Sequence, residues 1–316
     1  MSSRTGVQYF LFMRSIPSAA LAITFAACSF NTQGLLPPPE DVRPDPDVGE
    51  LPDVAEADAD PQDGDEDEGT VDIDVIEEID YPEGWLEGYS QRLRFHVDGR
   101  GVTEAIQNFP LLVALDAAQW LHGPVFEELD TREKRLKIAV TGDDGESELI
   151  VEVETWDAVA GKAWLWVRVP ELLPSTDETF FLYFEDVHAD NIENVGDPAS
   201  VIGVEVWDDW FKGVWHMSSF EGSPPILDST RNLHSGTTQG SMDPATDLVG
   251  GMIGPGIDFD GVNDFINVGD VGSDSWGEIT VEAWVNVRLP AEETDLDARV
   301  VCKSTGVHLG DHIFSL

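Results

Sequence analysis

Short apolar runs that alternate with polar residues recur through the middle of the chain, and turn-forming residues separate them. In Gln91-Arg-Leu-Arg-Phe-His-Val97, the side chains of Leu93, Phe95 and Val97 fall on one face of an extended segment. Thr141-Gly-Asp-Asp-Gly145 supplies a turn. The other runs of this kind cover residues 109–115, 134–140, 148–153, 163–169 and 179–184. With no long helical period between them, these runs predict an all-β chain of antiparallel β-sandwich modules.

The first 28 residues have the composition of an export signal. Arg4 and Arg14 precede an uncharged apolar stretch that ends in small residues before Cys28. The stretch is shorter than the roughly 20 residues that a membrane-spanning helix needs. The segment Leu21-Ala-Ile-Thr-Phe25-Ala26-Ala27-Cys28 resembles a bacterial lipobox, although Phe25 departs from the preferred Leu, Val or Ile. This resemblance implies a signal peptide over residues 1–28 and lipidation of Cys28, and Ser29 after the cysteine implies the outer membrane. An ordinary cleaved signal is the alternative.

Residues 29–84 form an acidic, proline-rich segment that cannot bury a core. Arg43 is its only base, and no aromatic residue occurs between Phe30 and Tyr81. Low hydrophobicity and mutual charge repulsion predict a disordered linker that holds the rest of the chain away from the membrane. The whole chain has 17 Lys+Arg against 62 Asp+Glu, a net charge of −45. A surface of this sign repels phosphate backbones, so nucleic acid is not an expected partner.

Five blocks in residues 91–190 give the chain a family resemblance. In order they are Phe109-Pro-Leu-Leu-Val, Leu136-Lys-Ile, Glu152-Val-Glu-Thr-Trp156-Asp157, Gly161-Lys-Ala-Trp-Leu-Trp-Val-Arg-Val-Pro170 and Phe181-Leu-Tyr-Phe184. Their order and spacing resemble the domain of unknown function 2341, with a departure at Glu185-Asp186, where that family more often has Gly-Asn. The resemblance implies a β-sandwich module of bacterial surface proteins over residues 85–200, and it implies no known chemistry.

Residues 205–316 carry a second resemblance. The blocks are Val214-Trp-His-Met217, Asp228-Ser-Thr-Arg-Asn232, Phe259-Asp-Gly-Val-Asn-Asp-Phe-Ile266 and Ile279-Thr-Val-Glu-Ala-Trp-Val285. This succession resembles the concanavalin A-like, laminin-G-like jelly-roll family. Such a fold needs more strands than these residues supply, so we expect an incomplete jelly roll, with a shortened module as the alternative. The segments 265–268, 279–287 and 298–303 would then need strand partners beyond Leu316.

Two groups of residues in this second region are candidate binding sites. Trp207, Trp210 and Trp215 occur within nine residues and are candidates for stacking on a glycan, although interface core explains them equally. Asp260, Asn263 and Asp264 are candidate calcium ligands through their side-chain oxygens. Turn formation alone is the alternative for this second group.

No catalytic residues are predicted. Glycosidases of the concanavalin-like fold use paired carboxylates, and Glu152-Val-Glu154 has that spacing, but it lies in a block that belongs to the first module's family pattern. His216 follows Trp215 in an apolar run and is expected to be a packed histidine rather than a ligand. Cys302, also in an apolar run, is expected to be a buried, inert thiol.

These features predict an exported, membrane-anchored surface protein whose β-sandwich modules bind a glycan or a surface protein without catalysis, with calcium as a candidate cofactor. The alternative is an accessory region of a polysaccharide-active hydrolase whose catalytic part lies outside this chain. A third hypothesis is association with an energised envelope complex, because modules that resemble the first also occur in proteins related to proton-channel components. The lack of an apolar spanning stretch after Cys28 in this sequence argues against a channel role.

Overall fold

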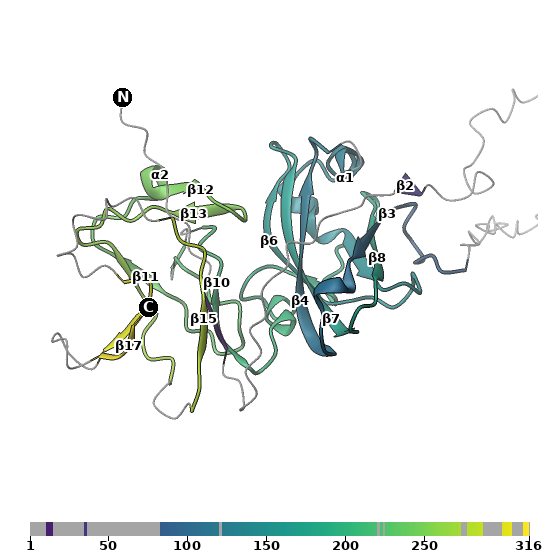
Figure 1. The fold of residues 1–316 in the computed structure, drawn as a ribbon. Coiled ribbons are helices and arrows are strands. Elements are labelled where there is room, and N and C mark those ends of the chain that lie inside the picture. Colours follow the sequence, from purple (N-terminus) through teal and green to yellow (C-terminus); the bar gives the residue numbers. More distant parts are fainter. Residues whose placement is uncertain are drawn as a thin grey trace, which may run out of the picture.

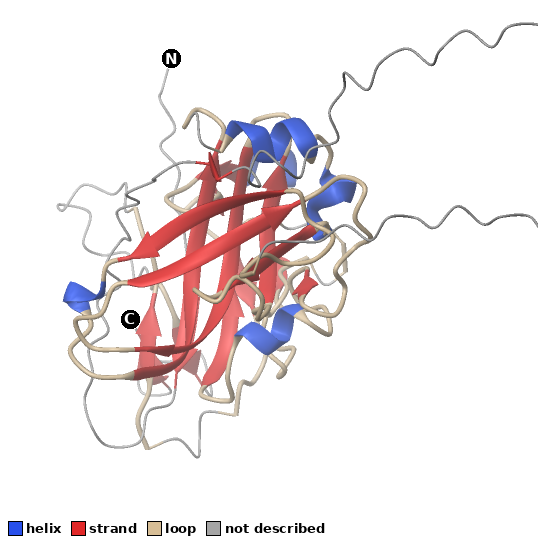
Figure 2. Ribbon diagram, turned by 90° about the vertical axis from the view of Figure 1, so that its right-hand side faces the viewer, coloured by secondary structure: helices blue, strands red, loops and turns tan. Residues whose placement is uncertain are grey.

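Strands dominate the protein (Figures 1 and 2). The computed structural model describes residues 11–14, 35–36, 83–119, 122–219, 222–223, 225–272, 277–286, 299–304 and 312–315. Within these residues the α-helices are short, namely α1 (Gly123–Glu128) and α2 (Pro244–Asp247). The prediction of an all-β fold is therefore confirmed.

Two four-stranded sheets make up the first part of the protein. The first sheet has the order β2 (Leu35–Leu36), β3 (Gln91–Val97), β8 (Glu178–Phe184) and β5 (Ile138–Thr141). The second sheet has the order β4 (Ile106–Asp116), β7 (Lys162–Leu172), β6 (Val151–Asp157) and β9 (Val195–Gly196). All pairings are antiparallel except that of β6 with β9. Alternate side chains of both sheets, such as Phe95 and Leu182 from one and Val113 and Leu165 from the other, share a single apolar core.

The outer faces of both sheets are covered as well. Trp85 and Tyr89 pack on the outer face of the first sheet against Phe181 and Tyr183. The segment that follows residue 203 packs on the outer face of the second sheet, where Trp207, Phe211 and Val214 form an apolar cluster with Trp166. Central strands are consequently buried on both sides, which explains why Phe180–Phe184 reads as a continuous apolar run. It also means that polar residues pointing outward from β6 do not reach water.

The second part consists of smaller sheets. One has β1 (Leu11–Arg14) between β10 (Phe211–Trp215) and β15 (Thr280–Glu282). Three strand pairs follow, and they join β11 (Thr237–Gln239) to β14 (Phe265–Asn267), β12 (Leu248–Gly250) to β13 (Pro255–Ile257), and β16 (Cys302–Ser304) to β17 (His312–Ser315). A separate apolar cluster around Trp215, Ile226 and Ile257 supports them.

Each of the three segments of this second part that we expected to need partners beyond Leu316 has a strand partner within this chain. β14 pairs with β11, β15 pairs with β1, and β16 pairs with β17, all within this chain. Each of these strands is thereby paired along one edge, and for β15 the partner is β1, which is distant in sequence and which a local pattern could not indicate. The described strands are also shorter than the apolar runs that predicted them.

One element of the first part differs from its prediction. The alternating run 134–140 predicts a single strand, but Arg132–Leu136 form a 3-10 helix and the strand begins only at Ile138. The helical turn places Lys134 Nζ 2.8 Å from the carboxylate of Asp130 and 3.0 Å from that of Asp186. In a strand, residues four apart would be separated by about 13 Å, so the turn is what allows the Lys134–Asp130 ion pair.

Candidate functional site: a buried carboxylate–histidine cluster

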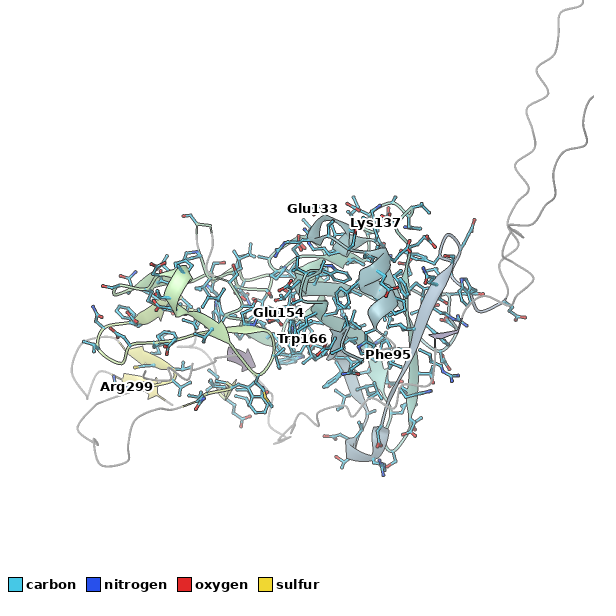
Figure 3. The ribbon with its side chains drawn as sticks, turned by 90° about the horizontal axis from the view of Figure 1, so that it is seen from above. Phe95, Glu133, Lys137, Glu154, Trp166 and Arg299 are labelled. Atoms are coloured by element: carbon cyan, nitrogen blue, oxygen red, sulfur yellow. The ribbon has the colours of Figure 1, made fainter. Side chains whose placement is uncertain are left out.

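Two glutamates of β6 point away from the core of the first part. Their neighbours Val151 and Val153 face that core, so Glu152 and Glu154 face the second part of the protein. The pairing of β6 with β7 shifts between Val153 and Thr155, which leaves Glu154 opposite no residue, as in a β-bulge. The exposed fraction is 0% for Glu152 and 6% for Glu154. Figure 3 shows Glu154 where the two parts of the protein meet, beside Trp166.

His216, which directly follows β10, lies between the two carboxylates. Its Nε2 is 3.3 Å from Oε1 of Glu152, and its Nδ1 is 3.3 Å from Oε2 of Glu154. The ring stacks on that of Trp166, with ring centroids 5.8 Å apart and an angle of 24° between the planes. The histidine is buried, so the imidazole lies between two carboxyl groups away from bulk water, with hydrogen-bond geometry toward Glu152 and an ion-pair distance to Glu154.

Indole and hydroxyl donors complete the cluster. Trp207 Nε1 donates to Oε2 of Glu152 at 2.5 Å, and Ser229 Oγ donates to Oε1 of the same carboxylate. Trp166 Nε1 donates to Oε2 of Glu154 at 2.7 Å. Both oxygens of Glu152 therefore accept hydrogen bonds. Oε1 of Glu154 has no hydrogen-bond partner among the described residues, which makes Glu154 the less satisfied carboxyl group.

The electrostatics of the cluster favour retention of a proton. Burial raises the pKa of Glu154 to about 7, an effect that nearby His216 and the Trp166 hydrogen bond oppose and that the charge of Glu152 strengthens. Burial by itself would lower the pKa of His216, but the carboxylates of Glu154 and Glu152 together outweigh burial and raise it. The cluster therefore takes up protons more readily than the same groups would in water.

Asp228 holds the loop that carries Ser229 in place. Its buried carboxylate accepts hydrogen bonds from the backbone N–H groups of Val214 at 3.0 Å, Thr230 at 2.9 Å and His234 at 2.8 Å. Burial raises the pKa of Asp228, and these backbone hydrogen bonds act against that rise. From the sequence, Asp228-Ser-Thr-Arg-Asn232 was expected only as one block of the jelly-roll resemblance. The Asp-Ser-Thr succession, which favours local side-chain-to-backbone hydrogen bonds, was the signal for its role.

The structure separates the three candidate glycan-stacking residues. Trp207 and Trp215 are buried, the first in the cluster and the second with its Nε1 donating to the carbonyl of His234 at 2.9 Å. Trp210 is 44% exposed. Burial makes Trp207 and Trp215 unable to stack on a sugar, which fits the interface-core alternative for these two residues and leaves Trp210 as the exposed candidate.

The acidic segment proposed for calcium forms a turn. Oδ1 of Asp260 accepts hydrogen bonds from the backbone N–H of Val262 at 2.7 Å and of Asn263 at 3.1 Å. Oδ2 of Asp264 accepts one from the N–H of Asp260 at 3.0 Å. In the part of the chain that the structure describes, no three or more His, Cys, Asp or Glu residues converge on a point where a metal ion would fit. Calcium binding here stays a prediction.

The structure tests the expectation for only one of the two cysteines. Cys28 lies outside the described residues. Cys302 is exposed as a free thiol, so the expectation that it is buried is wrong. It belongs to the two-stranded pair of β16 and β17, which is too small to bury both of its faces.

Among the described residues there is no helix with the length and apolar character required to cross a bilayer. Comparisons of this chain with protein-family models, with curated proteins and with solved structures gave no match.

Proposed function

We propose that this is an exported surface protein, anchored by a lipid on Cys28, whose two β parts bind and present an extracellular ligand without catalysis. The observation that supports a non-catalytic role is the state of the Glu152–Glu154 pair. A glycosidase must place its substrate between the two carboxyl groups. Here that space is occupied by His216, and indole and hydroxyl donors of the protein engage the carboxylates. The cluster joins the two parts and leaves no position for a sugar.

A candidate binding surface includes Trp210, which lies three residues after Trp207 of the cluster. Trp210 is 44% exposed and directly follows Asp209, which Arg231 reaches at 3.1 Å in an ion-pair network that also includes Glu205. An exposed aromatic ring flanked by charged hydrogen-bonding groups is an arrangement that suits a sugar, because the ring covers the apolar face and the polar groups bind hydroxyls. The proposed ligand is therefore a neutral or basic glycan, since the chain's net charge of −45 disfavours acidic ones.

Trp210→Ala should remove glycan binding without changing the thermal transition, because this side chain contributes contact area to a ligand and little to the interior. A glycan array probed with the purified protein, with and without calcium, would measure this. The matched control is Trp284→Ala, since Trp284 is 48% exposed and belongs to a different segment of the chain from Trp210 and Arg231. No signal on any glycan in either condition would contradict the lectin role. Hydrolysis of a glycan that Glu154→Gln abolishes would favour the hydrolase alternative.

Cys28→Ala should release the protein from the membrane. Several acyl chains on one N-terminus hold a protein firmly, whereas one chain binds only marginally. The wild-type protein is expected to partition into the detergent phase and to incorporate labelled fatty acid, and the variant should do neither. Cys302→Ala is the control because it removes the other cysteine while leaving the anchor. Abundant soluble wild-type protein in the medium would contradict anchoring.

A further inference from the structure

We propose that the space between β10 and β15 is a strand-acceptor site, and that in the processed protein it binds an extended apolar segment of a second polypeptide. The proposal rests on the proposed function in one respect, because cleavage before Cys28 removes the residues that fill this space in the full chain. The site itself is a property of the described strands and exists whether or not the chain is exported.

The backbone of the full chain shows what kind of segment fits. β1 lies between β10 and β15 and is antiparallel to both. Along β10 the pairs are Leu11 with Trp215, Phe12 with Val214, and Met13 with Gly213. Along β15 the pairs are Phe12 with Glu282, Met13 with Val281, and Arg14 with Thr280. One four-residue segment thus joins two strands that lie 65 or more residues apart in sequence.

Removing this segment would leave two facing strand edges. Neighbouring strands in a sheet are about 4.8 Å apart, so β10 and β15 are separated by about twice that distance and cannot hydrogen-bond to each other. Unpaired edges of this kind are templates for an added strand. Recognition by strand addition obtains its affinity from main-chain hydrogen bonds and its specificity from alternate side chains. Here both edges would contribute main-chain bonds to one occupant.

The walls of the site are apolar. Val214 and Trp215 of β10 are fully buried, and Val281 of β15 packs on the same cluster as Trp215. Beside them, a Cβ added to Gly213 would lie 2.1 Å from the ring of Trp215, so the indole lies directly over that glycine. A segment with alternate apolar side chains would extend these clusters. A polar segment would lose hydrogen bonds to water without replacement.

Charge further restricts which polypeptide segments can occupy the site. Leu11-Phe-Met-Arg14 contains one cation and no acid, and β15 carries Glu282. The net charge of −45 on the whole chain repels acidic segments and also repels a second copy of the protein. A second copy processed at Cys28 would in addition lack residues 11–14. We therefore assign the site to a partner polypeptide that offers an apolar strand with a basic residue and no acidic one.

The test uses the full chain with residues 1–28 retained, so that it does not depend on export or cleavage. Met13→Pro removes a backbone donor from β1 and should displace it from the sheet. A fluorescent peptide of residues 9–16, Tyr9-Phe-Leu-Phe-Met-Arg-Ser-Ile16, is the probe. It should bind the variant saturably and bind the wild-type chain at least about tenfold more weakly, because the wild-type site is open in only a fraction of molecules. The same peptide with proline at the position of Met13 is the control and should not bind.

Hydrogen exchange supplies a second measurement. The backbone amides of β10 and β15 should be protected in the wild-type chain, exchange faster in the variant and regain protection when the peptide is added. A second variant, in which a Gly-Ser segment replaces residues 9–16, should behave in the same way. Equal binding to variant and wild type, no protection on adding peptide, or failure of peptide to restore either variant would overturn the proposal. Dimerisation of the variants without peptide would overturn the assignment to a different polypeptide.

The peptide-binding test of the acceptor site and the Cys28→Ala test of membrane anchoring can succeed or fail independently. If Cys28→Ala shows that the protein is not anchored but the peptide binds Met13→Pro, the acceptor site is supported and the anchoring proposal fails. If the chain is anchored and the peptide does not bind, the acceptor site fails alone.

Discussion

Replacing His216 with leucine is expected to lower the free energy of unfolding by about 3–5 kcal/mol at neutral pH, because breaking a buried ion pair leaves uncompensated charge in the interior. Glu152 would lose its partner at 3.3 Å while remaining fully buried, and Glu154 would lose the cation that stabilises its ionised form. Unfolding in guanidinium, followed by tryptophan fluorescence, measures this directly. Trp166 and Trp207 flank the histidine and report on the cluster.

The matched control removes the charges together. The triple variant His216→Leu, Glu152→Gln, Glu154→Gln should recover a large part of the lost stability, because glutamine keeps an acceptor for the indole donors and carries no charge. If His216→Leu costs less than about 1 kcal/mol, or if the triple variant is as unstable as the single one, the imidazole is not compensating the carboxylates. Non-additivity among the three changes would measure their coupling.

The second large effect is an unusual dependence of stability on pH. The pKa of Glu154 in the folded protein is raised from its usual 4.5 to about 7, so the folded state binds more protons than the unfolded state in this window. Its contribution to stability is fully present below the unfolded pKa and is lost as pH rises through the folded one. Since each pH unit across the window corresponds to about 1.4 kcal/mol, the free energy of unfolding should fall by about 2–3 kcal/mol between about pH 4.5 and pH 7.

Other groups set the limits of this window. The pKa of His216 is also raised, so its contribution is fully present below its usual pKa of 6.5 and is lost as pH rises from that value through the raised pKa of the folded state. In the opposite direction, the hydrogen bond with Arg231 lowers the pKa of Glu205, whose contribution is lost as pH falls through that lowered pKa. We therefore expect maximum stability in mildly acidic solution rather than at neutral pH.

Glu154→Gln should flatten this profile and make the protein more stable than wild type at pH 8, by about 1–3 kcal/mol, because the variant has no carboxyl group to ionise in the interior. Chemical denaturation at pH 5, 6, 7 and 8 measures the profile. Glu193→Gln, at an exposed position, is the control and should leave the slope unchanged. A wild-type protein whose stability rises from pH 5 to pH 8 would show that the cluster does not hold a proton.

Local sequence determined the strands of the first part well. The strand predicted at residues 91–97 has the same bounds in the structure, and those predicted at 109–115, 163–169 and 179–184 lie within β4, β7 and β8. These strands form where alternation of apolar side chains matches the two-residue period of a pleated chain, a property that a few adjacent residues define. The 3-10 helix at Arg132–Leu136 escaped prediction because alternation over a short run does not distinguish a strand from a helical turn, and the contact of Lys134 with Asp186 joins residues that are far apart in sequence.

The sequence indicated part of the candidate site. The sequence shows the Glu152–Glu154 spacing, and because side chains of a strand point alternately to its two faces, both glutamates of β6 were expected on the same face. It could not say whether that face meets water or protein. The same uncertainty applied to Trp207, Trp210 and Trp215, which are identical in type and close in sequence but differ in exposure.

What only the tertiary structure decided is which surfaces meet. Glu152 and His216 are 64 residues apart, and β1 and β15 are still farther apart, yet each pair is in contact. The burial of a residue depends on contacts with segments that are far away in sequence, and the pattern of neighbouring residues carries no information about those contacts. The free energy of a charged or unpaired group depends in turn on that burial, because desolvation shifts its pKa and removes water as a partner. For this protein the sequence determined the strands and the acidic character, and the packing of one part on the other determined the chemistry of the cluster between them.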